Sequence, residues 1–236
     1  MKVIVGTIVQ KDNKILLVQE AKEKVYSKWN IPGGNLNDNK SLFAAAKREF
    51  KEETGYDIKL ENFIGCYNKI KEKDAVLVFR FSGSIISGDI DFDKNEVLSV
   101  EWKDIDEIEK MTKEEMRNYD INKDAINKLK NNEVYPLNKN HNPKIITICG
   151  SLKYFNEMIS ISKKLKLEGN IVLTPVFDKN KSYSKEEIDL LGKVHKEKIK
   201  LSDAIFVVNI DNYIGDSTKS EIDLAKSLNK EIIYYN

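Results

Sequence analysis

The sequence predicts an α/β protein built from two domains, and three observations lead to this expectation. First, 236 residues suffice for two domains of roughly 100 to 140 residues each. Second, the segment Asn138–Pro143 is polar, lacks aromatic residues and closes on a proline, which is typical of a linker. Third, strands and helices alternate strictly after this segment but not before it. We therefore expect a mixed sheet in residues 1–137, a linker at 138–143 and a parallel sheet in residues 144–236.

Before the linker, five segments have strand-like apolar runs and two have helical patterns. The first helix should present Leu42, Ala45, Ala46 and Phe50 to a core, and Gly55 suits its C-terminus. The predicted strands are Val3–Gln10, Lys14–Glu20, Phe63–Lys69, Ala75–Ser84 and Val97–Trp102, and the helices are at about Leu42–Thr54 and Ile105–Leu129.

After the linker, the alternation of strand and helix predicts parallel βαβ units with helices on both faces of the sheet, as in Rossmann or flavodoxin-like folds. In such open sheets the ligand crevice lies beyond the carboxyl ends of the strands. The predicted strands are Lys144–Cys149, Ile171–Val176, Ala204–Asn209 and Glu231–Tyr235, and the helices are Tyr154–Glu168, Lys185–Leu201 and Thr218–Leu228.

Composition excludes several classes of protein. The 39 Lys and Arg against 38 Asp and Glu give a net charge of +1, which argues against binding of a nucleic acid polymer. With 41% hydrophobic residues, the chain can bury a core and is not expected to be disordered. Cys66 and Cys149 are far apart and outside any CxxC spacing, so neither a disulfide scaffold nor a thiolate zinc site is expected. The first apolar run ends at Gln10 and no stretch approaches the roughly 20 residues of a membrane span, so we expect a cytoplasmic protein.

The most informative helix is the first, because Glu49, Glu52 and Glu53 are spaced i, i+3 and i+4 and should share one face. Three neighbouring carboxylates repel one another unless a hard cation that prefers oxygen ligands neutralises them. The spacing therefore points to Mg²⁺ or Mn²⁺. The alternative is an acidic helix face exposed to solvent.

The residues around this helix closely resemble the signature of the Nudix hydrolases. The resemblance rests on Trp29, the Ile31–Gly34 run and the stretch Arg48–Tyr56, and it covers about residues 1 to 135. It implies an α/β/α sandwich and metal-assisted cleavage of a nucleotide pyrophosphate. By position it makes Glu49, Glu52 and Glu53 the metal ligands, with the Gly33 carbonyl as a further ligand and Arg48 as the residue that orients them.

Two further positions bear on catalysis by this half. The family commonly takes another acidic residue from a later loop, and Glu96 stands at the expected place, although it could equally be a solvated loop charge. The first glutamate of the motif is replaced by Lys40. By the resemblance, that position supports the loop and the arginine, so its loss leaves open a non-catalytic domain that binds a pyrophosphate compound.

In the second half, three loops should follow the carboxyl ends of strands: Gly150–Lys153, Phe177–Ser184 and Ile210–Ser217. Gly150 and Ser151 lie at a strand-to-helix turn, where free N–H groups and a positive helix end suit phosphate, and Lys153 adds charge. A plain turn with Ser151 near the N-cap is the alternative. Thr218 and Glu221 have the spacing of a capping box, which would give this glutamate a structural role.

The second half also resembles the nucleoside 2-deoxyribosyltransferase-like superfamily over about residues 144 to 236. The matching segments are Ile148–Lys153, Ser202–Val208 and Gly215–Thr218 with Glu221, Ile222 and Ala225. This resemblance implies that Glu221 is a carboxylate nucleophile that attacks the anomeric carbon of a sugar. Gly150, Ser151, Lys153, Asp216, Ser217 and Thr218 would then hold the substrate, a nucleoside monophosphate.

One departure concerns the acid/base group of this second site. Relatives often carry an aspartate where this chain has His195. A histidine can transfer protons near neutrality, whereas a lone histidine on a lysine-rich helix can also be a surface residue.

Together the motifs predict an enzyme that acts on small nucleotides with Mg²⁺ or Mn²⁺. The first half would cleave a nucleoside triphosphate or a nucleoside diphosphate derivative, and the second would cleave the N-glycosidic bond of a (deoxy)nucleoside 5-monophosphate. Two alternatives stay open: a nucleotide sensor with a non-catalytic first half, or an active first half joined to a binding-only second domain. Relatives of both halves often form dimers, so the resemblances also imply a homodimer as one option.

Overall fold

The computed structural model of the chain describes residues 1–37, 41–71, 74–137, 143–178 and 181–235. The contacts divide the chain into two compact units. One consists of residues 2–70 and 76–135, and the other consists of residues 136–236 together with Met1 and residues 71–75. The division falls beside the predicted linker, of which residues 138–142 lie outside the described residues.

The N-terminal unit is built on an eight-stranded mixed sheet with the order β3-β2-β1-β6-β5-β8, while β4 pairs with β1 and β7 with β2. Strand β1 is parallel to β6 and antiparallel to β2 and β4. The mixed sheet that the sequence predicts is therefore present. The strands are β1 (Lys2–Lys11), β2 (Lys14–Glu20), β3 (Trp29–Asn30), β4 (Gly33–Asn35), β5 (Asp57–Lys71), β6 (Asp74–Ser87), β7 (Val97–Asp104) and β8 (Tyr135–Pro136).

Helix α1 (Leu42–Thr54) begins and ends where its sequence predicts. The Ser41 hydroxyl accepts a hydrogen bond from the Ala44 amide at 3.1 Å and caps the N-terminus. Gly55 follows in the left-handed conformation, with φ +83°, and its amide donates to the Lys51 carbonyl. The predicted apolar stripe of Leu42, Ala45, Ala46 and Phe50 is buried.

The second helix of this unit differs from the prediction. Instead of one helix over Ile105–Leu129, the chain forms α2 (Ile105–Lys110) and α3 (Tyr119–Lys130). A short 3₁₀ helix, η1 (Glu23–Val25), lies earlier in the unit, between β2 and β3. The intervening segment pairs with β3: the Trp29 amide donates to the Glu115 carbonyl at 2.7 Å, and the Arg117 amide donates to the Trp29 carbonyl at 2.9 Å. These hydrogen bonds to a distant strand interrupt the helix.

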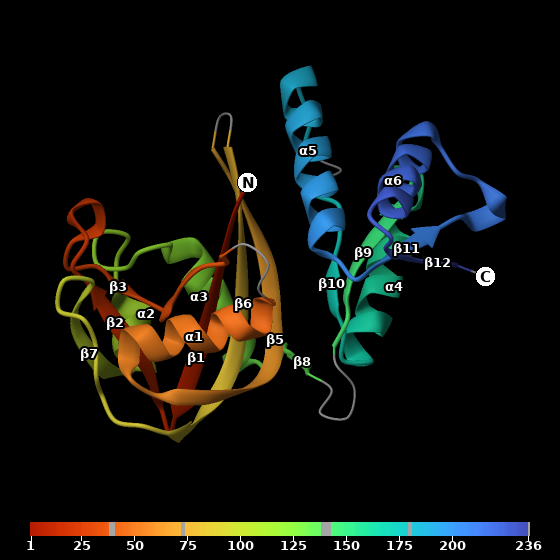
Figure 1. Cartoon of the computed structure of the whole chain (residues 1–236). Coiled ribbons are helices and arrows are strands. Elements are labelled where there is room, and N and C mark those ends of the chain that lie inside the picture. Colours follow the sequence, from red (N-terminus) through yellow and green to blue (C-terminus); the bar gives the residue numbers. More distant parts are fainter. Residues whose placement is uncertain (38–40, 72–73, 138–142, 179–180, 236) are drawn as a thin grey trace. The chain divides into compact units, whose positions relative to one another are not determined.

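The sheet is covered on both faces, which makes the unit an α/β/α sandwich, with α1 lying across one face (Figure 1). Along β2, Leu16 and Val18 pack in a core cluster with Phe50 of α1. The alternate residues Ile15 and Leu17 pack in a second cluster, which contains residues of α2 and α3. The period of two along this strand thus separates the two cores.

The C-terminal unit is a four-stranded parallel sheet with the order β10-β9-β11-β12, as the alternation of elements predicts. The predicted strand Ile171–Val176 is shorter and ends at Leu173. The strands are β9 (Ile145–Gly150), β10 (Ile171–Leu173), β11 (Ala204–Val208) and β12 (Glu231–Tyr234). The helices are α4 (Phe155–Leu167), α5 (Lys185–Leu201) and α6 (Asp216–Ser227), with 3₁₀ helices η2 (Leu152–Tyr154) and η3 (Ile210–Asn212).

Helices cover both faces of this sheet as well. Along β9, Ile148 packs in a cluster with Met158 of α4, whereas Cys149 packs in one with Ile199 of α5 and Ile222 of α6. Gly150 at the end of β9 pairs with Val208 at the end of β11. The loops after these two strands therefore leave the sheet at the same edge, as expected for a ligand crevice.

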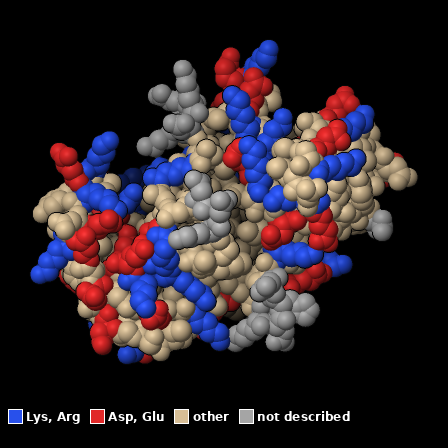
Figure 2. All heavy atoms as spheres, in the orientation of Figure 1, with Lys and Arg blue, Asp and Glu red and all other residues tan. Residues whose placement is uncertain are grey.

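Surface charges of both signs are interspersed on the face shown in Figure 2. This mixture agrees with the net charge of +1. None of the helices in the described part of the chain is long and apolar enough to cross a membrane.

Candidate functional site

Helix α1 holds two of its glutamates against the Gly33–Gly34 strand. The Glu53 carboxylate is buried, and its Oε2 accepts a hydrogen bond from the Gly33 amide at 2.8 Å. The Glu49 carboxylate lies so close to Gly34 that a Cβ there would stand 1.9 Å from Glu49 Oε2. Gly34 thus leaves the space that Glu49 occupies, which explains the need for glycine in the motif.

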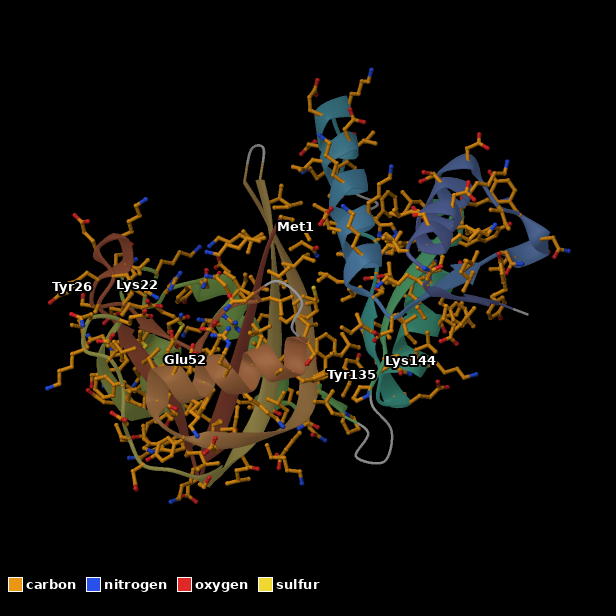
Figure 3. All side chains as sticks on the ribbon, viewed as in Figure 1. Met1, Lys22, Tyr26, Glu52, Tyr135 and Lys144 are labelled. Atoms are coloured by element: carbon orange, nitrogen blue, oxygen red, sulfur yellow. The ribbon has the colours of Figure 1, made fainter. Side chains whose placement is uncertain are left out.

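Arg48 binds two of the carboxylates of this helix, Glu49 and Glu52. Its guanidinium donates hydrogen bonds to Glu49 Oε1 at 2.5 Å, to Glu52 Oε2 at 2.6 Å and to the carbonyl of Asn35 at 3.0 Å. The Glu52 side chain is 56% exposed. Figure 3 labels Glu52 on α1. Among the residues described, Glu49, Glu52 and Glu53 do not form a group whose ligand atoms all lie within 4.8 Å of one another. The spacing places them on one helix, and Arg48 draws Glu52 toward itself.

The electrostatics of this site fit a divalent cation. Burial raises the pKa of Glu53 to about 8, and the carboxylates of Glu20 and Glu49 add to this effect, while the Gly33 amide opposes it. Burial also raises the pKa of Glu49, against the opposing effect of Arg48. Carboxyl groups with raised pKa values lack sufficient positive charge nearby, and a divalent cation with a preference for oxygen ligands would supply it. The residues present therefore suit Mg²⁺ or Mn²⁺.

Glu96 lies at the edge of this site. Its carboxylate forms an ion pair with Lys22 Nζ at 3.2 Å, and its side chain is 58% exposed. The positive charge of Lys22 also acts on Glu53 and Glu20. Lys22 therefore links Glu96 electrostatically to the buried carboxylates, although no catalytic contact of Glu96 follows from this geometry. Lys40 lies outside the described residues.

Sequence reasoning missed a buried polar network beside this site. The Arg80 guanidinium, fully buried within β6, donates to Asn122 Oδ1 at 2.9 and 3.2 Å, and burial lowers the pKa of this arginine to about 10. Asn122 donates to Asn30, which in turn donates to Glu20 at 2.9 Å, and Glu20 pairs with Arg117. The available signal was an arginine inside the apolar run Ala75–Phe81.

The C-terminal unit contains a cavity of about 470 Å³ at the edge predicted for a ligand crevice. Most of the predicted substrate residues of this unit line the cavity. Lys153 does not line it; its Nζ lies 5.2 Å from the ring centre of Tyr154. The predicted residues in the lining are Gly150, Ser151, His195, Asp216, Ser217, Thr218 and Glu221, and apolar side chains, among them Phe177, Ile188 and Leu191, form another part.

Helix α6 points its N-terminus toward this cavity, since Gly215 and the first residues of the helix are in the lining. Gly215 is the N-cap and has no side chain with which to cap the helix. The capping box expected from Thr218 and Glu221 is not formed, because the helix starts at Asp216; instead, Ser217 Oγ donates to Glu221 Oε1 at 3.3 Å. The uncapped end suits an anionic group.

His195 and Glu221 lie side by side in the cavity wall. His195 Nε2 is 3.7 Å from Glu221 Oε1, and the histidine is 8% exposed, which excludes the surface position considered above. Burial lowers the pKa of His195 to about 3, so the imidazole is neutral at physiological pH, and burial raises the pKa of Glu221 to about 7. Cys149, which the sequence did not single out, lies 3.8 Å from His195 Nε2.

Comparisons with known proteins bear on the N-terminal unit. A sequence model of the family described as the NUDIX domain matches residues 1–124. An 8-oxo-dGTP diphosphatase of Buchnera aphidicola subsp. Schizaphis graminum is 37% identical over 90 residues, which are 36% of this chain and 68% of that protein. An ADP-ribose pyrophosphatase of Methanocaldococcus jannaschii is 36% identical over 66 residues, 28% of this chain and 39% of that protein.

A solved structure agrees with these sequence matches. The NUDIX hydrolase from Nitrosomonas europaea superimposes with a TM-score of 0.52 at 30% identity, over 58% of this chain and 93% of that one. The curated relatives are matched over part of their length. A Bacillus subtilis protein, for example, is 36% identical over 95 residues, which are 40% of this chain and 60% of that protein.

Proposed function

This chain belongs to the Nudix family, and from that premise we propose that its N-terminal unit is a pyrophosphohydrolase of small nucleotides that depends on Mg²⁺ or Mn²⁺. The observation that carries the proposal is the pair of desolvated carboxylates, Glu49 and Glu53, packed on the backbone of Gly33 and Gly34. The names of the relatives support two kinds of substrate, a nucleoside triphosphate such as 8-oxo-dGTP and a nucleoside diphosphate derivative such as ADP-ribose.

In this proposal the residues of α1 have distinct tasks. Glu49 and Glu53 are held rigidly, by Arg48 and by the Gly33 amide, and with Glu52 and the Gly33 carbonyl they would bind the cation. The bound cation would neutralise the pyrophosphate oxygens and lower the pKa of the attacking water. Glu52 is the most exposed of the three, so it is the carboxylate placed to accept a proton from water near the substrate.

The test is hydrolysis of a nucleotide panel with Mg²⁺ or Mn²⁺, read by mass. We expect the full chain to cleave a pyrophosphate bond, and Glu53→Gln to lower kcat by about 100-fold or more. Glu61→Gln, at an exposed glutamate that accepts a hydrogen bond from Ser84, is the matched control and should retain activity. Nucleotide binding without turnover would instead favour the sensor alternative and refute the hydrolase proposal.

A second function is favoured by the cavity of the C-terminal unit. In this part of the proposal, Glu221 attacks the anomeric carbon of a (deoxy)nucleoside 5-monophosphate, and the electrons of the broken N-glycosidic bond leave with the base, which takes up a proton from solvent water. Water then releases the sugar 5-phosphate from Glu221. His195, whose Nε2 lies 3.7 Å from Glu221 Oε1, is placed to accept a hydrogen bond from that water, whose proton leaves to solvent. With a pKa of about 3, the neutral imidazole is a weak base at physiological pH. Ser151, Ser217 and the N-terminus of α6 would hold the phosphate.

Base release from a panel of nucleoside monophosphates tests this second function. Glu221→Gln should abolish the release, because an amide is a poor nucleophile, while pyrophosphate cleavage by the same variant continues. Base release that persists in Glu221→Gln contradicts the nucleophile assignment. Absence of base release from the unaltered chain leaves the second domain as a binding module, without affecting the proposal for the first.

The two proposed reactions form a sequence. Pyrophosphate cleavage yields a nucleoside monophosphate, which is the substrate class proposed for the second unit. The Nudix unit would therefore supply the C-terminal cavity with its ligand. The support for this coupling is the presence of both units in one chain, together with the phosphate-binding features of the cavity.

A further inference from the structure

Three side chains from different elements meet beside the C-terminal cavity: Cys149 from β9, His195 from α5 and Glu221 from α6. Cys149 Sγ lies 3.8 Å from His195 Nε2, which lies 3.7 Å from Glu221 Oε1. The three ligand atoms all lie within 4.8 Å of one another. Among the described residues, no other three metal-ligating side chains come together in this way. All three residues are buried.

The hydrogen bonding of this group is incomplete. Glu221 Oε2 and His195 Nδ1 are buried and have no hydrogen-bond partner among the residues described. Burial and the Glu221 carboxylate both raise the pKa of the Cys149 thiol, so the group as it stands favours the protonated sulfur. The neutral imidazole keeps a lone pair available for a ligand. A bound cation would compensate the carboxylate and the thiolate together.

We propose that Cys149, His195 and Glu221 form a binding site for a transition-metal cation of the zinc class. Tetrahedral zinc, with bonds of about 2.3 Å to sulfur and about 2.0 Å to nitrogen and oxygen, separates its ligand atoms by roughly 3.3 to 3.6 Å. The two separations that involve His195, 3.7 and 3.8 Å, need to close by only a few tenths of an ångström, and the Cys149 and Glu221 ligand atoms lie within 4.8 Å of each other. Sulfur and imidazole ligands favour zinc over Mg²⁺, which distinguishes this site from the carboxylates of α1.

The cavity gives such an ion an entry path and an open coordination position. His195 and Glu221 both line the cavity, whereas Cys149 lies behind them. A site with three protein ligands and one position open to a cavity can take water or an anionic ligand in the fourth position. The spacing of the cysteines did not reveal this group, because its members come from three elements.

The site has a consequence for the proposed glycosidase, and this part rests on that proposed function. Glu221 cannot bind zinc and attack a sugar at the same time. Zinc should therefore inhibit base release, and chelation should restore it. Metal binding itself does not depend on any activity of the second unit, so the two ideas can fail separately.

The direct test uses the full chain, freed of metal by a chelator and titrated with Co²⁺ as a spectroscopic substitute for Zn²⁺. A thiolate ligand gives a sulfur-to-cobalt charge-transfer band, whereas oxygen ligands such as those of α1 do not. We expect one such band, saturating at one Co²⁺ per chain and displaced by Zn²⁺. Cys149→Ala should abolish it, and Cys66→Ala, which removes the other cysteine, should leave it unchanged.

Two further variants guard against loss of folding in Cys149→Ala. His195→Gln and Glu221→Gln keep the thiol and the shape of the site, and each should weaken Zn²⁺ binding by about 10-fold or more. Zn²⁺ should also raise the melting temperature of the unaltered chain and of Cys66→Ala more than that of these two variants. Absence of the charge-transfer band, or its survival in Cys149→Ala with loss in Cys66→Ala, would overturn the proposal.

Discussion

The carboxylate of Glu53 is buried against the Gly33 amide, and its pKa lies near 8, far above the usual value of 4.5. The folded state therefore holds a proton that the unfolded state releases above pH 4.5. As a result, the free energy of unfolding should fall as the pH rises from about 4.5 to 8, and this destabilisation should disappear below that window.

This linkage leads to a prediction in which stability and activity move in opposite directions. In the presence of a chelator, Glu53→Gln should raise the free energy of unfolding at pH 8 by roughly 1 to 3 kcal/mol and have little effect near pH 4.5. Thermal unfolding at the two pH values measures this, with Glu61→Gln as the control. Mg²⁺ should stabilise the unaltered chain at pH 8 but not Glu53→Gln; equal stabilisation of both would contradict a cation site at Glu53.

At the same scale, the sequence predicted residue identities better than their geometry. The spacing of Glu49, Glu52 and Glu53 correctly puts them on one helix, yet the pull of Arg48 on Glu52 depends on rotamers that no spacing encodes. Cys149 was passed over because its neighbours in space come from other elements. A motif cannot predict contacts between residues that only the fold brings together, such as those of Cys149 with His195 and Glu221.

At the scale of elements, helix ends are fixed by a few backbone positions. Gly55 ends α1 at φ +83°, and a Cβ there would lie 2.2 Å from the carbonyl oxygen of Asp89. Gly192 lies inside α5, where a Cβ would meet no atom within 4 Å. The same substitution should therefore have opposite effects at these two glycines.

We predict that Gly55→Ala lowers the free energy of unfolding by about 1 to 2 kcal/mol from the left-handed conformation alone, with a further loss from the clash. Gly192→Ala should raise it by roughly 0.5 to 1 kcal/mol, because alanine loses less conformational freedom in a helix. Denaturant unfolding of the two variants provides the comparison. Destabilisation by Gly192→Ala would show that the helix interior there is less open than the structure indicates.

Most elements were predictable because periodicity and capping are local. The order of strands and helices in the C-terminal unit follows from alternation alone, and the C-terminal end of α1 follows from Gly55. The division of Ile105–Leu129 into α2 and α3 was not predictable, because hydrogen bonds from residues 115 and 117 to Trp29 interrupt an otherwise helical pattern. Local preference gave way there to a contact between residues more than 80 positions apart.

At the scale of the whole molecule, near-neutral charge has a specific meaning. A net charge of +1 argues against a surface that coats nucleic acid, but it is compatible with small polyanionic ligands. In the proposed functions, such ligands meet charge only locally, at a cation on α1 in one unit and at the N-terminus of α6 in the other. In the proposed functions, each unit thus meets its ligand's charge at one place, while charges of both signs are interspersed on the face shown in Figure 2.

The parallel pairing of β1 with β6 also constrains how the N-terminal unit is made. Eight residue pairs, from Lys2 with Val76 to Val9 with Gly83, join segments about 74 positions apart in the chain. During synthesis β1 can form its hairpin with β2 early, but its other edge has no β6 partner until most of the unit has been translated. Such long-range closure is slow, so this edge is where an incompletely folded chain is most exposed to pairing with another chain.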